Sequence, residues 1–341
     1  MGNLKPAAWQ GIVARHRHAN AWKAGWQLLN TLGPYLLTWV VYYWCASAGI
    51  WWLVPPLVLL ASGLLVRAFI IFHDCGHGSF FRSRFANDFW GCICGVLTFT
   101  PYYQWRSEHA IHHGTAGDLD KRGTGDVWTM TVREYLAASR YRRFAYRLAR
   151  NPFALLVVGP LVMFLVVQRF ANAKAGVRER HSVWWTNAVI LLVGAAVSIV
   201  TGFWTYFIFQ FAILLVAGSC GVWLFYVQHQ FEEAYWERGK DWDYGVAALK
   251  GSSYLKLPRI LQWMSGNIGF HHIHHLSPRI PNYNLERCHR SEPLFRDIKP
   301  MTLGAGLAAL NLRLWDESTR RLVGFRSLRP ALSARPRTRR S

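Results

Sequence analysis

Two long stretches of the sequence contain no Asp, Glu, Lys or Arg, and they restrict the fold more than any other feature. They run from Ala24 to Val66 and from Ser182 to Phe231. One membrane-spanning helix needs about 20 apolar residues, so each stretch is long enough for two helices joined by a tight turn. The sequence therefore predicts an all-α integral membrane fold with four transmembrane helices at Leu28–Ala48, Ile50–Phe72, Trp184–Thr201 and Phe203–Val227.

Two further apolar runs, Phe89–Tyr103 and Phe153–Val167, are shorter than a single span. Basic residues flank both runs on both sides. Because basic loops stay on the cytoplasmic side of a membrane, each run is expected to enter the bilayer and return, or to lie at its surface. We therefore predict two re-entrant or interfacial helices beside the four spans.

The charge distribution predicts the orientation of the chain. The sequence has 39 Lys and Arg against 18 Asp and Glu, a formal net charge of +21, yet the turns between the paired spans carry no charge. The positive-inside rule then places both termini in the cytoplasm, below what we expect to be a bacterial inner membrane. We divide the chain into a cytoplasmic N-terminal segment (1–27), a membrane domain (28–320) and a basic tail (321–341) that is expected to be disordered near anionic lipid. The six cysteines lack zinc-ribbon spacing, and no disulfide is expected.

Nine of the fourteen histidines occur in four places that this topology puts on the cytoplasmic face. They are His73 and His77; His109, His112 and His113; His229; and His271, His274 and His275. Spacings of i, i+3 and i+4 put side chains on one face of a helix. A structural zinc ion takes four ligands, so nine imidazoles suit two ions with four or five nitrogens each and an open position. Imidazole suits iron, zinc, copper and nickel, and the sequence predicts a helical cap that carries a di-metal site.

Some polar residues near these histidines are expected to have other roles. Nearby carboxylates would orient the rings by accepting their N–H groups; the candidates are Asp74, Glu108, Glu232 and Glu233. The remaining histidines do not fit the spacing and are expected to be ordinary polar residues: His16, His18, His181, His272 and His289.

The motifs resemble those of the integral-membrane fatty acid desaturase family, which carries three histidine boxes in the order HxxxH, HxxHH and HxxHH. The segments "HDCGHGSFF" (73–81), "WRSEHAIHHGTAGDLDKRGTGDVWT" (105–129) and "GNIGFHHIHHLSPRIPNYNLERCH" (266–289) look like the bacterial acyl-lipid branch that includes Δ12 (omega-6) enzymes. The resemblance covers roughly residues 45–290. It implies that the nine histidines bind two iron ions. One position departs from acyl-CoA-type relatives, which have asparagine where this chain has Phe225.

The resemblance implies an O2-dependent di-iron desaturase that introduces a cis double bond into a fatty acyl chain, expected to be lipid-linked. No side chain has a pKa suited to removing a methylene hydrogen, so no catalytic residue is expected apart from the metal ligands, and the metal supplies the oxidant. The sequence shows no haem, flavin or dinucleotide motif. Electrons are therefore expected from a small acidic, ferredoxin-like carrier steered by the basic face. No nucleic-acid partner is expected.

Two alternatives stay open at this point. A hydroxylase or a carotenoid ketolase uses the same histidine-box scaffold, although the "PRIPNYNL" segment after the third box favours a desaturase. A metal transporter would carry its ligands near the bilayer midplane, in broken helices, whereas these histidines lie at the ends of the predicted spans. The position of the double bond, the head group, the electron donor and the oligomeric state are not predicted.

Overall fold

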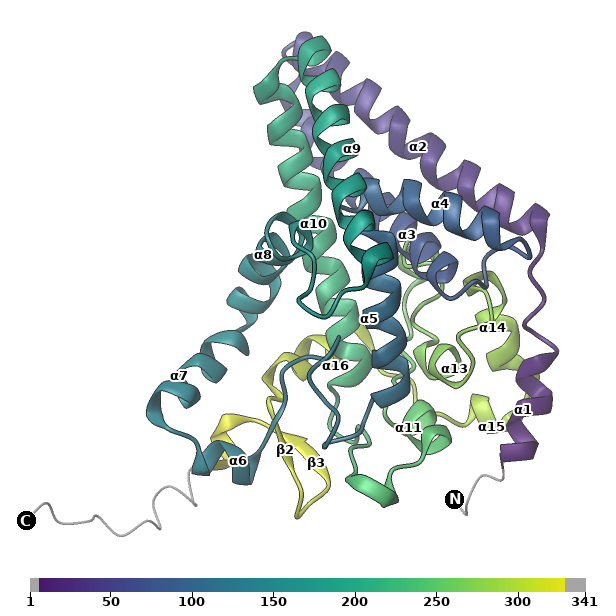
Figure 1. The fold of residues 1–341 in the computed structure, drawn as a ribbon, viewed down its shortest axis with the longest axis vertical. Helices are drawn as coiled ribbons and strands as arrows, with labels where there is room; N and C mark the ends of the chain where they lie inside the picture. Colours follow the sequence, from purple (N-terminus) through teal and green to yellow (C-terminus); the bar gives the residue numbers. More distant parts are fainter. Residues whose placement is uncertain (1–5, 329–341) are drawn as a thin grey trace, which may run out of the picture.

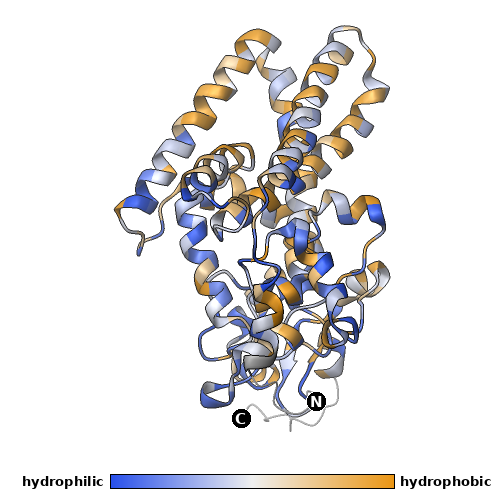
Figure 2. Ribbon diagram, turned by 90° about the vertical axis from the view of Figure 1, so that its right-hand side faces the viewer, coloured by the Kyte–Doolittle hydropathy of each residue, from blue (hydrophilic) through white to orange (hydrophobic). Residues whose placement is uncertain are grey.

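The computed structural model describes residues 6–328 and is mostly helical (Figure 1). Three long helices, α2 (Ala21–Ser47), α9 (Val177–Thr201) and α10 (Phe203–His229), extend toward one end of the molecule. Short helices and a small sheet gather at the other end. Apolar residues dominate the long helices, and hydrophilic residues are concentrated at the end with the short elements (Figure 2). The molecule therefore has a membrane part and a polar part.

Three helices in the described part of the chain are long and apolar enough to cross a membrane. They are α9, α10 and the segment Trp51–Gly76, which consists of η1 (Trp51–Leu53) and α3 (Val54–Gly76). These helices coincide with three of the four predicted spans. The fourth prediction, Leu28–Ala48, lies within α2, which has 27 residues but is rich in Trp and Tyr and is not among the apolar helices.

The two short apolar runs also form helices. Residues 89–103 form most of α4 (Arg84–Leu97) and the start of α5 (Tyr102–Thr115). Residues 153–167 form the π-helix η2 (Ala154–Val158), α8 (Gly159–Leu165) and the start of η3 (Val167–Arg169). Together with α7 (Arg140–Ala149), the second run makes a pair bent by 65°, which is either a broken span or a re-entrant loop. Within residues 6–328, three helices are thus long and apolar enough to cross a membrane, or four if the bent pair is one span.

Glycine allows both of the predicted uncharged turns. Gly49 has φ of 73° and Gly202 has φ of 88°, a conformation that disfavours any residue with a Cβ. The N–H of Gly202 donates to the carbonyl of Ser198 at the end of α9, and α10 starts at the next residue. Each uncharged stretch therefore folds back on itself as a helical hairpin.

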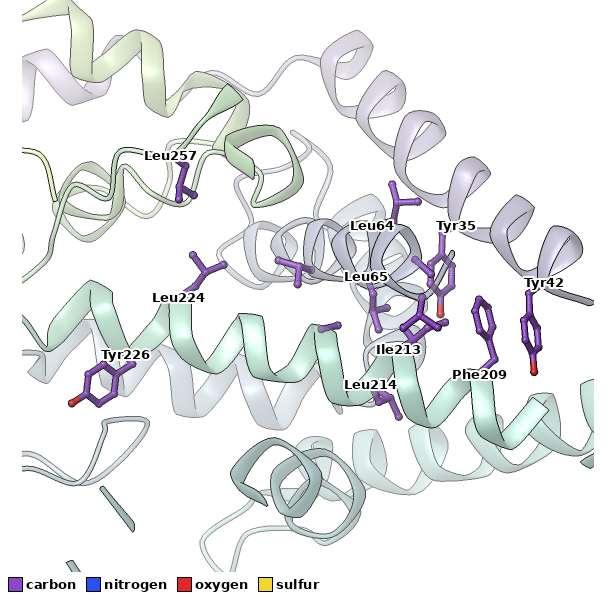
Figure 3. Packing of buried hydrophobic residues seen from close by; sticks show 14 of the residues in the cluster. Tyr35, Tyr42, Leu64, Leu65, Phe209, Ile213, Leu214, Leu224, Tyr226 and Leu257 are labelled. Carbon is purple, nitrogen blue, oxygen red and sulfur yellow. The ribbon is translucent and has the colours of Figure 1, made fainter. Parts of the chain in front are cut away.

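An apolar core joins α2, α3 and α10 (Figure 3). Tyr42 of α2 stacks on Phe209 of α10, with ring centroids 3.9 Å apart, while Leu65 of α3 lies beside Ile213 of α10. Within a bilayer, such close packing rather than removal from water holds helices together. The core fixes α3 beside α10, and both helices end in histidines.

The polar end, here called the cap, comprises residues 6–20, 102–137 and 230–328. Its helices besides α5 are α1 (Pro6–Ala14), α6 (Val132–Ala137), η4 (Gly239–Asp241), α11 (Tyr244–Lys250), α12 (Arg259–Met264), α13 (His271–Leu276), α14 (Asn282–Ser291), α15 (Pro293–Arg296), α16 (Leu303–Ala308), η5 (Ala309–Asn311) and η6 (Phe325–Leu328). The cap is the predicted helical cap, and α1 begins within the predicted N-terminal segment 1–27.

A three-stranded sheet, which the all-α prediction did not include, also lies in the cap. β1 (Met130–Thr131) pairs parallel with β2 (Leu314–Asp316), with Met130 opposite Leu314, and β2 pairs antiparallel with β3 (Arg321–Val323). The predicted disordered tail began at residue 321. The structure instead places β3 and η6 there, so the folded part reaches Leu328, and residues 329–341 lie outside the described residues.

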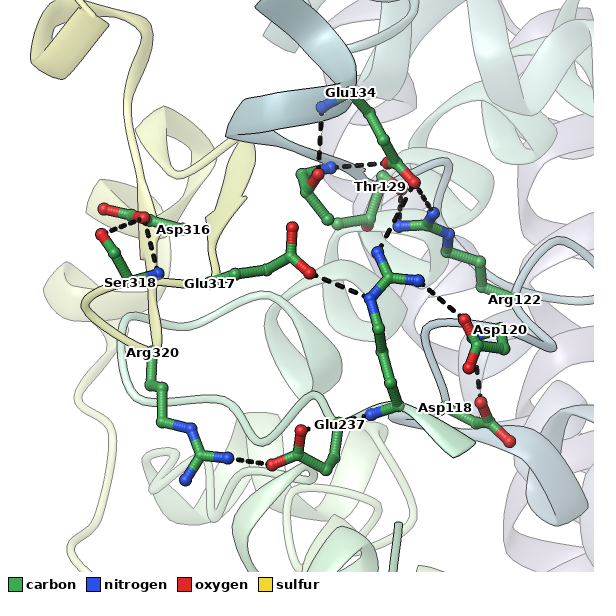
Figure 4. A network of polar contacts seen from close by, with 12 residues as sticks. Asp118, Asp120, Arg122, Thr129, Glu134, Glu237, Asp316, Glu317, Ser318 and Arg320 are labelled. Carbon is green, nitrogen blue, oxygen red and sulfur yellow. Dashed lines mark hydrogen bonds and ion pairs between the residues drawn. The ribbon is translucent and has the colours of Figure 1, made fainter. Parts of the chain in front are cut away.

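Ion pairs hold the long connection between α5 and β1 to the rest of the cap (Figure 4). Arg238 pairs with Asp120 at 2.7 Å and with Glu317 at 2.9 Å. Arg122 pairs with Glu134 and donates to the Thr129 carbonyl at 3.1 Å. These contacts restrict the loop that follows α5, and this loop contributes a carboxylate to the site described below.

A buried arginine connects α7 to the end of α10. Arg150 is 1% exposed, and its guanidinium donates to Tyr226 Oη at 3.1 Å, to Gln230 Oε1 at 2.7 Å and to the Leu312 carbonyl at 3.0 Å. None of its partners within the described residues is a carboxylate. Tyr226 and Gln230 lie on either side of His229 in the chain, so Arg150 helps to fix that histidine.

Arg150→Ala should lower the free energy of unfolding by about 2–4 kcal/mol, because it leaves buried acceptors without their charged donor. Thermal unfolding of the purified protein in detergent is the measurement. Arg140→Ala is the matched control, since Arg140 is exposed on α7, and it should change stability by less than about 0.5 kcal/mol. Equal unfolding temperatures for the two variants would show that the Arg150 contacts are unimportant.

Candidate metal centre

Four separate segments deliver the nine predicted histidines to one place. The last turn of α3 carries His73, and His77 caps that helix. α10 ends at His229. The cap helices α5 and α13 each carry three of the nine, on the spacing i, i+3, i+4. Two segments therefore come from the membrane part and two from the cap.

The nine rings form two groups. The five-histidine group contains His73, His77, His109, His113 and His274, and the four-histidine group contains His112, His229, His271 and His275. Within each group, one nitrogen from every ring lies within 4.8 Å of the others. The groups adjoin, since His113 stacks on His275 with ring centroids 4.2 Å apart. The structure thus confirms a buried, histidine-rich site with two centres.

Helix geometry explains which ring enters which group. Histidines four residues apart stay together: His73 with His77, His109 with His113, and His271 with His275. The i+3 histidine of α5, His112, joins the other group, and so does His274 of α13. Side chains at i+3 and i+4 leave a helix in different directions. A single HxxHH helix can therefore serve two adjacent centres.

The facing nitrogens indicate what the site holds. His229 Nε2 lies 3.1 Å from His112 Nε2 and 3.0 Å from His271 Nε2. His113 Nε2 lies 3.1 Å from His109 Nε2 and 3.0 Å from His274 Nε2. A neutral imidazole has one donor and one acceptor nitrogen, so such clusters cannot satisfy every lone pair internally.

Further buried nitrogens lack any partner. His77 Nε2 and His275 Nε2 have no hydrogen bond within the described residues. Leaving buried polar atoms unsatisfied is costly, and a cation at the centre of each group would satisfy several lone pairs at once. The residues present therefore fit two metal ions.

Burial keeps these rings in the form that binds metal. Desolvation, followed by repulsion from neighbouring histidines, holds the pKa of His113 well below 6.5, and the same causes lower the pKa of His274 and of His275. Metal ligation requires the neutral imidazole. The rings thus need not lose a proton before an ion enters at neutral pH.

In three rings, those of His73, His112 and His229, the second nitrogen, Nδ1, contacts a fixed acceptor. This contact turns Nε2 toward the groups. His73 Nδ1 lies 3.1 Å from Asp74 Oδ1, and the other Asp74 oxygen accepts the main-chain and side-chain N–H groups of Asn282 at 2.6 and 2.9 Å. His229 Nδ1 faces the Gly251 carbonyl at 3.2 Å. Contacts of this kind orient metal-binding histidines, and Asp74 lies where the sequence analysis expected such a carboxylate.

The sequence analysis missed one carboxylate of this type. Asp126 Oδ1 lies 2.7 Å from His112 Nδ1. It sits in the loop after α5, fourteen positions from its partner, so helical spacing could not identify it. The preceding Gly125 has φ of +71°, and a Cβ there would lie 3.1 Å from the Cβ of His112. This close approach, visible in sequence only as a Gly-Asp pair, brings Asp126 to the ring.

The other three predicted carboxylates have different partners. Glu108 accepts from Asn172 Nδ2 at 3.2 Å. Glu232 and Glu233 face Arg321 at 3.2 and 3.9 Å and are largely exposed. None of the three contacts a histidine ring within the described residues. α10 ends at His229, so residues 232 and 233 do not follow the helix into the site.

Comparison with known proteins identifies the chain. The sequence profile described as "Fatty acid desaturase" matches residues 49–301. The chain is 46% identical over 303 residues to a fatty acid desaturase of Bacillus subtilis, covering 89% of this chain and 86% of that protein. It belongs to the fatty acid desaturase family. The desaturase is therefore an oxidoreductase of lipid metabolism with a histidine-rich metal site.

Two more distant relatives come from Synechocystis. One, named sn-1 oleoyl-lipid 12-desaturase, is 30% identical over 245 residues, which cover 71% of this chain and 68% of that protein. The other, named sn-1 acyl-lipid omega-3 desaturase (ferredoxin), is 26% identical over 260 residues, which cover 72% and 69%.

The five histidines that were predicted to be ordinary polar residues lie outside both groups. His272 Nε2 faces His289 Nδ1 at 3.2 Å, and both rings are buried. Although His272 is within the third box, its ring contacts His289 and Tyr254 and belongs to neither metal group. Phe225, the departure from acyl-CoA-type relatives, lies one turn before His229 and places its ring 5.3 Å from that of His112. An apolar side chain thus covers the four-histidine group at that position.

Asp126→Asn should weaken metal retention by about 10–100-fold, because it removes the charge that orients and polarises His112. The measurement is the metal content of purified desaturase after challenge with graded chelator. Asp241→Asn, at the exposed last residue of η4, is the matched control and should retain metal like the wild type. Identical chelator curves for both variants would contradict the assigned role of Asp126.

Proposed function

We propose that this desaturase holds one iron ion in each histidine group and uses O2 to introduce a cis double bond into the acyl chain of a membrane lipid. The arrangement of five and four facing imidazoles is the observation that carries the proposal. The five-histidine group would bind one ion through His73, His77, His109, His113 and His274. The four-histidine group would bind the other through His112, His229, His271 and His275.

Iron is proposed because of the substrate's chemistry. The methylene groups of an acyl chain are not acidic, so no side-chain acid or base in the site removes their hydrogens. Histidine-bound non-haem iron supplies, when reduced by external electrons, the O2-dependent oxidation that this reaction needs. The four-histidine group would hold its ion with one ring fewer than the five-histidine group, which would leave room for exogenous ligands.

The chain's own residues position the site and exclude water from it. Trp105 stacks on His109 with ring centroids 4.3 Å apart, and Phe225 covers the other group. Gly76 allows this arrangement, because a Cβ there would lie 2.9 Å from Trp105. Excluding bulk water protects a reactive centre from side reactions.

A lipid-linked substrate is supported by the position of the site and by the relatives' names. Both α3 and α10 leave the membrane part at histidines, so the site is next to acyl chains. An apolar cavity of about 330 Å³ lies between α2, α4, α9 and α10, with Trp39, Phe99 and Val193 in its wall. Two of the relatives are named for oleoyl-lipid and acyl-lipid substrates.

Expression in a host without polyunsaturated lipids should yield lipids lighter by two hydrogens per acyl chain, with a new cis double bond located by gas chromatography and mass spectrometry. Purified protein should contain about two iron ions per chain. His274→Ala should abolish product and lower iron content, because it removes a ring from the five-histidine group, whereas His181→Ala, at an exposed position, should retain both.

The same measurements decide between alternatives. A product heavier by one oxygen atom would instead support a hydroxylase, and ketolated carotenoids would support a ketolase. If His112→Ala left product formation unchanged but altered cellular iron uptake, the result would support a transporter. Active protein without iron would overturn the metal assignment.

We further propose that a small acidic carrier such as a ferredoxin delivers electrons to the cap, on the cytoplasmic side. The net charge of +21 supports steering of an acidic partner, and one relative is named for ferredoxin.

Raising ionic strength from about 0.05 to 0.5 M should slow ferredoxin-driven turnover several-fold, because salt screens attraction between separated charges. Inside-out membrane vesicles should accept electrons from added ferredoxin, and right-side-out vesicles should not. Salt-independent rates would contradict steering, and turnover in right-side-out vesicles alone would reverse the orientation.

A further inference from the structure

A polar recess with a volume of about 510 Å³ adjoins the metal centre. His77 of the five-histidine group is part of its wall, and five arginines surround it: Arg17, Arg82, Arg84, Arg106 and Arg279. Neither the reaction nor the metal site requires this many cations here.

The arginines come from segments that are far apart in sequence but linked to the boxes. Arg82 follows the first box, Arg106 precedes the second and Arg279 follows the third. Arg17 belongs to the segment between α1 and α2, and Arg84 is the first residue of α4. The fold that assembles the histidines therefore also gathers guanidinium groups on one side of them.

Positive charge in this recess is poorly compensated. Asp88 is the one carboxylate in its wall. That carboxylate is shared, since it lies 3.1 Å from Arg106 and 4.0 Å from Arg84, and also 3.4 Å from Arg178 outside the recess. Several guanidinium groups close to one another repel, and one carboxylate does not balance them.

Three of the arginines have unused donors. Arg17 donates through Nε to Ser277 Oγ at 2.8 Å, and Arg82 donates through Nε to the Ala19 carbonyl at 3.2 Å. Their Nη groups have no hydrogen-bond or ion-pair partner within the described residues, and neither does the Arg279 side chain. Free guanidinium forks match the oxygens of a phosphate, which they bind through two parallel hydrogen bonds.

The helix beside this recess has the features of a helix at a membrane surface. α4, which carries Arg84 and Asp88, exposes Phe85 and Phe89 one turn apart, at 78% and 49%. Exposed aromatic rings beside charged residues on one helix are typical of a helix in the membrane interface. The phosphates of bilayer lipids lie in this interface, so a phosphate bound by the arginines would come from the bilayer.

We infer that the arginine recess binds the phosphate of the lipid head group, and that the substrate is an acyl chain of a glycerophospholipid. This inference rests on the proposed function and deepens it, because it names the substrate class. A phosphate held beside His77 brings the start of the attached acyl chain to the five-histidine group. Lipids without phosphate, such as glycolipids and diacylglycerol, lack the group that the arginines recognise.

The test is lipid binding by purified, iron-loaded desaturase, measured by native mass spectrometry in detergent. Phosphatidylglycerol and diacylglycerol with identical acyl chains are the probes. Arg82→Gln combined with Arg279→Gln should weaken phosphatidylglycerol binding about 10–100-fold and leave diacylglycerol binding unchanged. The matched control is Arg140→Gln combined with Arg142→Gln, which removes the same charge from exposed positions of α7 and should bind phosphatidylglycerol like the wild type.

Further measurements distinguish a lipid phosphate from other phosphates and test whether loss of binding results from misfolding. Inorganic phosphate should compete only at high concentration if the lipid is the ligand, and equal potency would overturn the lipid assignment. The lipid assignment would also be overturned if the Arg82→Gln, Arg279→Gln variant lost binding to a soluble acyl-carrier thioester but bound phosphatidylglycerol like the wild type. Arg82→Lys combined with Arg279→Lys keeps the charge but not the fork, so it should fold and lose part of the affinity.

Wild-type affinity for diacylglycerol equal to that for phosphatidylglycerol would overturn the inference whatever the variants do. Iron content is measured in every sample. Absence of any desaturated product, with phosphate-dependent binding as expected, would refute the proposed function and not the recess.

Discussion

Nine imidazoles packed around two points are the arrangement on which the rest of this structure depends. Their nitrogens approach to 3.0 Å, a distance at which lone pairs repel unless a proton or a cation lies between them. Protonation is opposed by burial and by the neighbouring rings, which lower the pKa of His113. A metal ion in each group resolves both problems, and the surrounding fold holds the rings in place for it.

Packing within the membrane part and polar contacts in the cap contribute differently to that placement. The aromatic and aliphatic contacts among α2, α3 and α10 set the two membrane helices side by side, and so bring His73 and His229 to the same level. Arg150 then ties the end of α10 to the cap. The loop after α5 is fixed by Arg122 and Arg238, and this places Asp126 on His112. Apolar contacts thus bring the histidine-bearing membrane helices together, and charged contacts orient the side chains at their ends.

The sequence predicted the parts of this structure that depend on local periodicity. Uncharged stretches predicted the helical hairpins around Gly49 and Gly202. The histidine spacing predicted a site for two metal ions, but not which ring joins which group. The sequence did not predict features whose position depends on contacts between distant parts of the chain. Asp126 reaches His112 through a loop, β1 and β3 are too short to leave a pattern, and Glu232 follows a helix end whose direction no local signal gives. α2 was predicted from its lack of charge, although its Trp and Tyr residues make it less apolar than the other long helices.

Both α5 and α13 contribute rings to both histidine groups. The separation of the two centres is therefore set by the angle between neighbouring side chains on one rigid helical turn. It does not depend on the distance between the cap and the membrane part. Sliding the cap against the membrane part would distort each centre before it changed their separation. Two ions bound by these rings would therefore keep a fixed separation, which only unwinding a turn of α5 or α13 would alter.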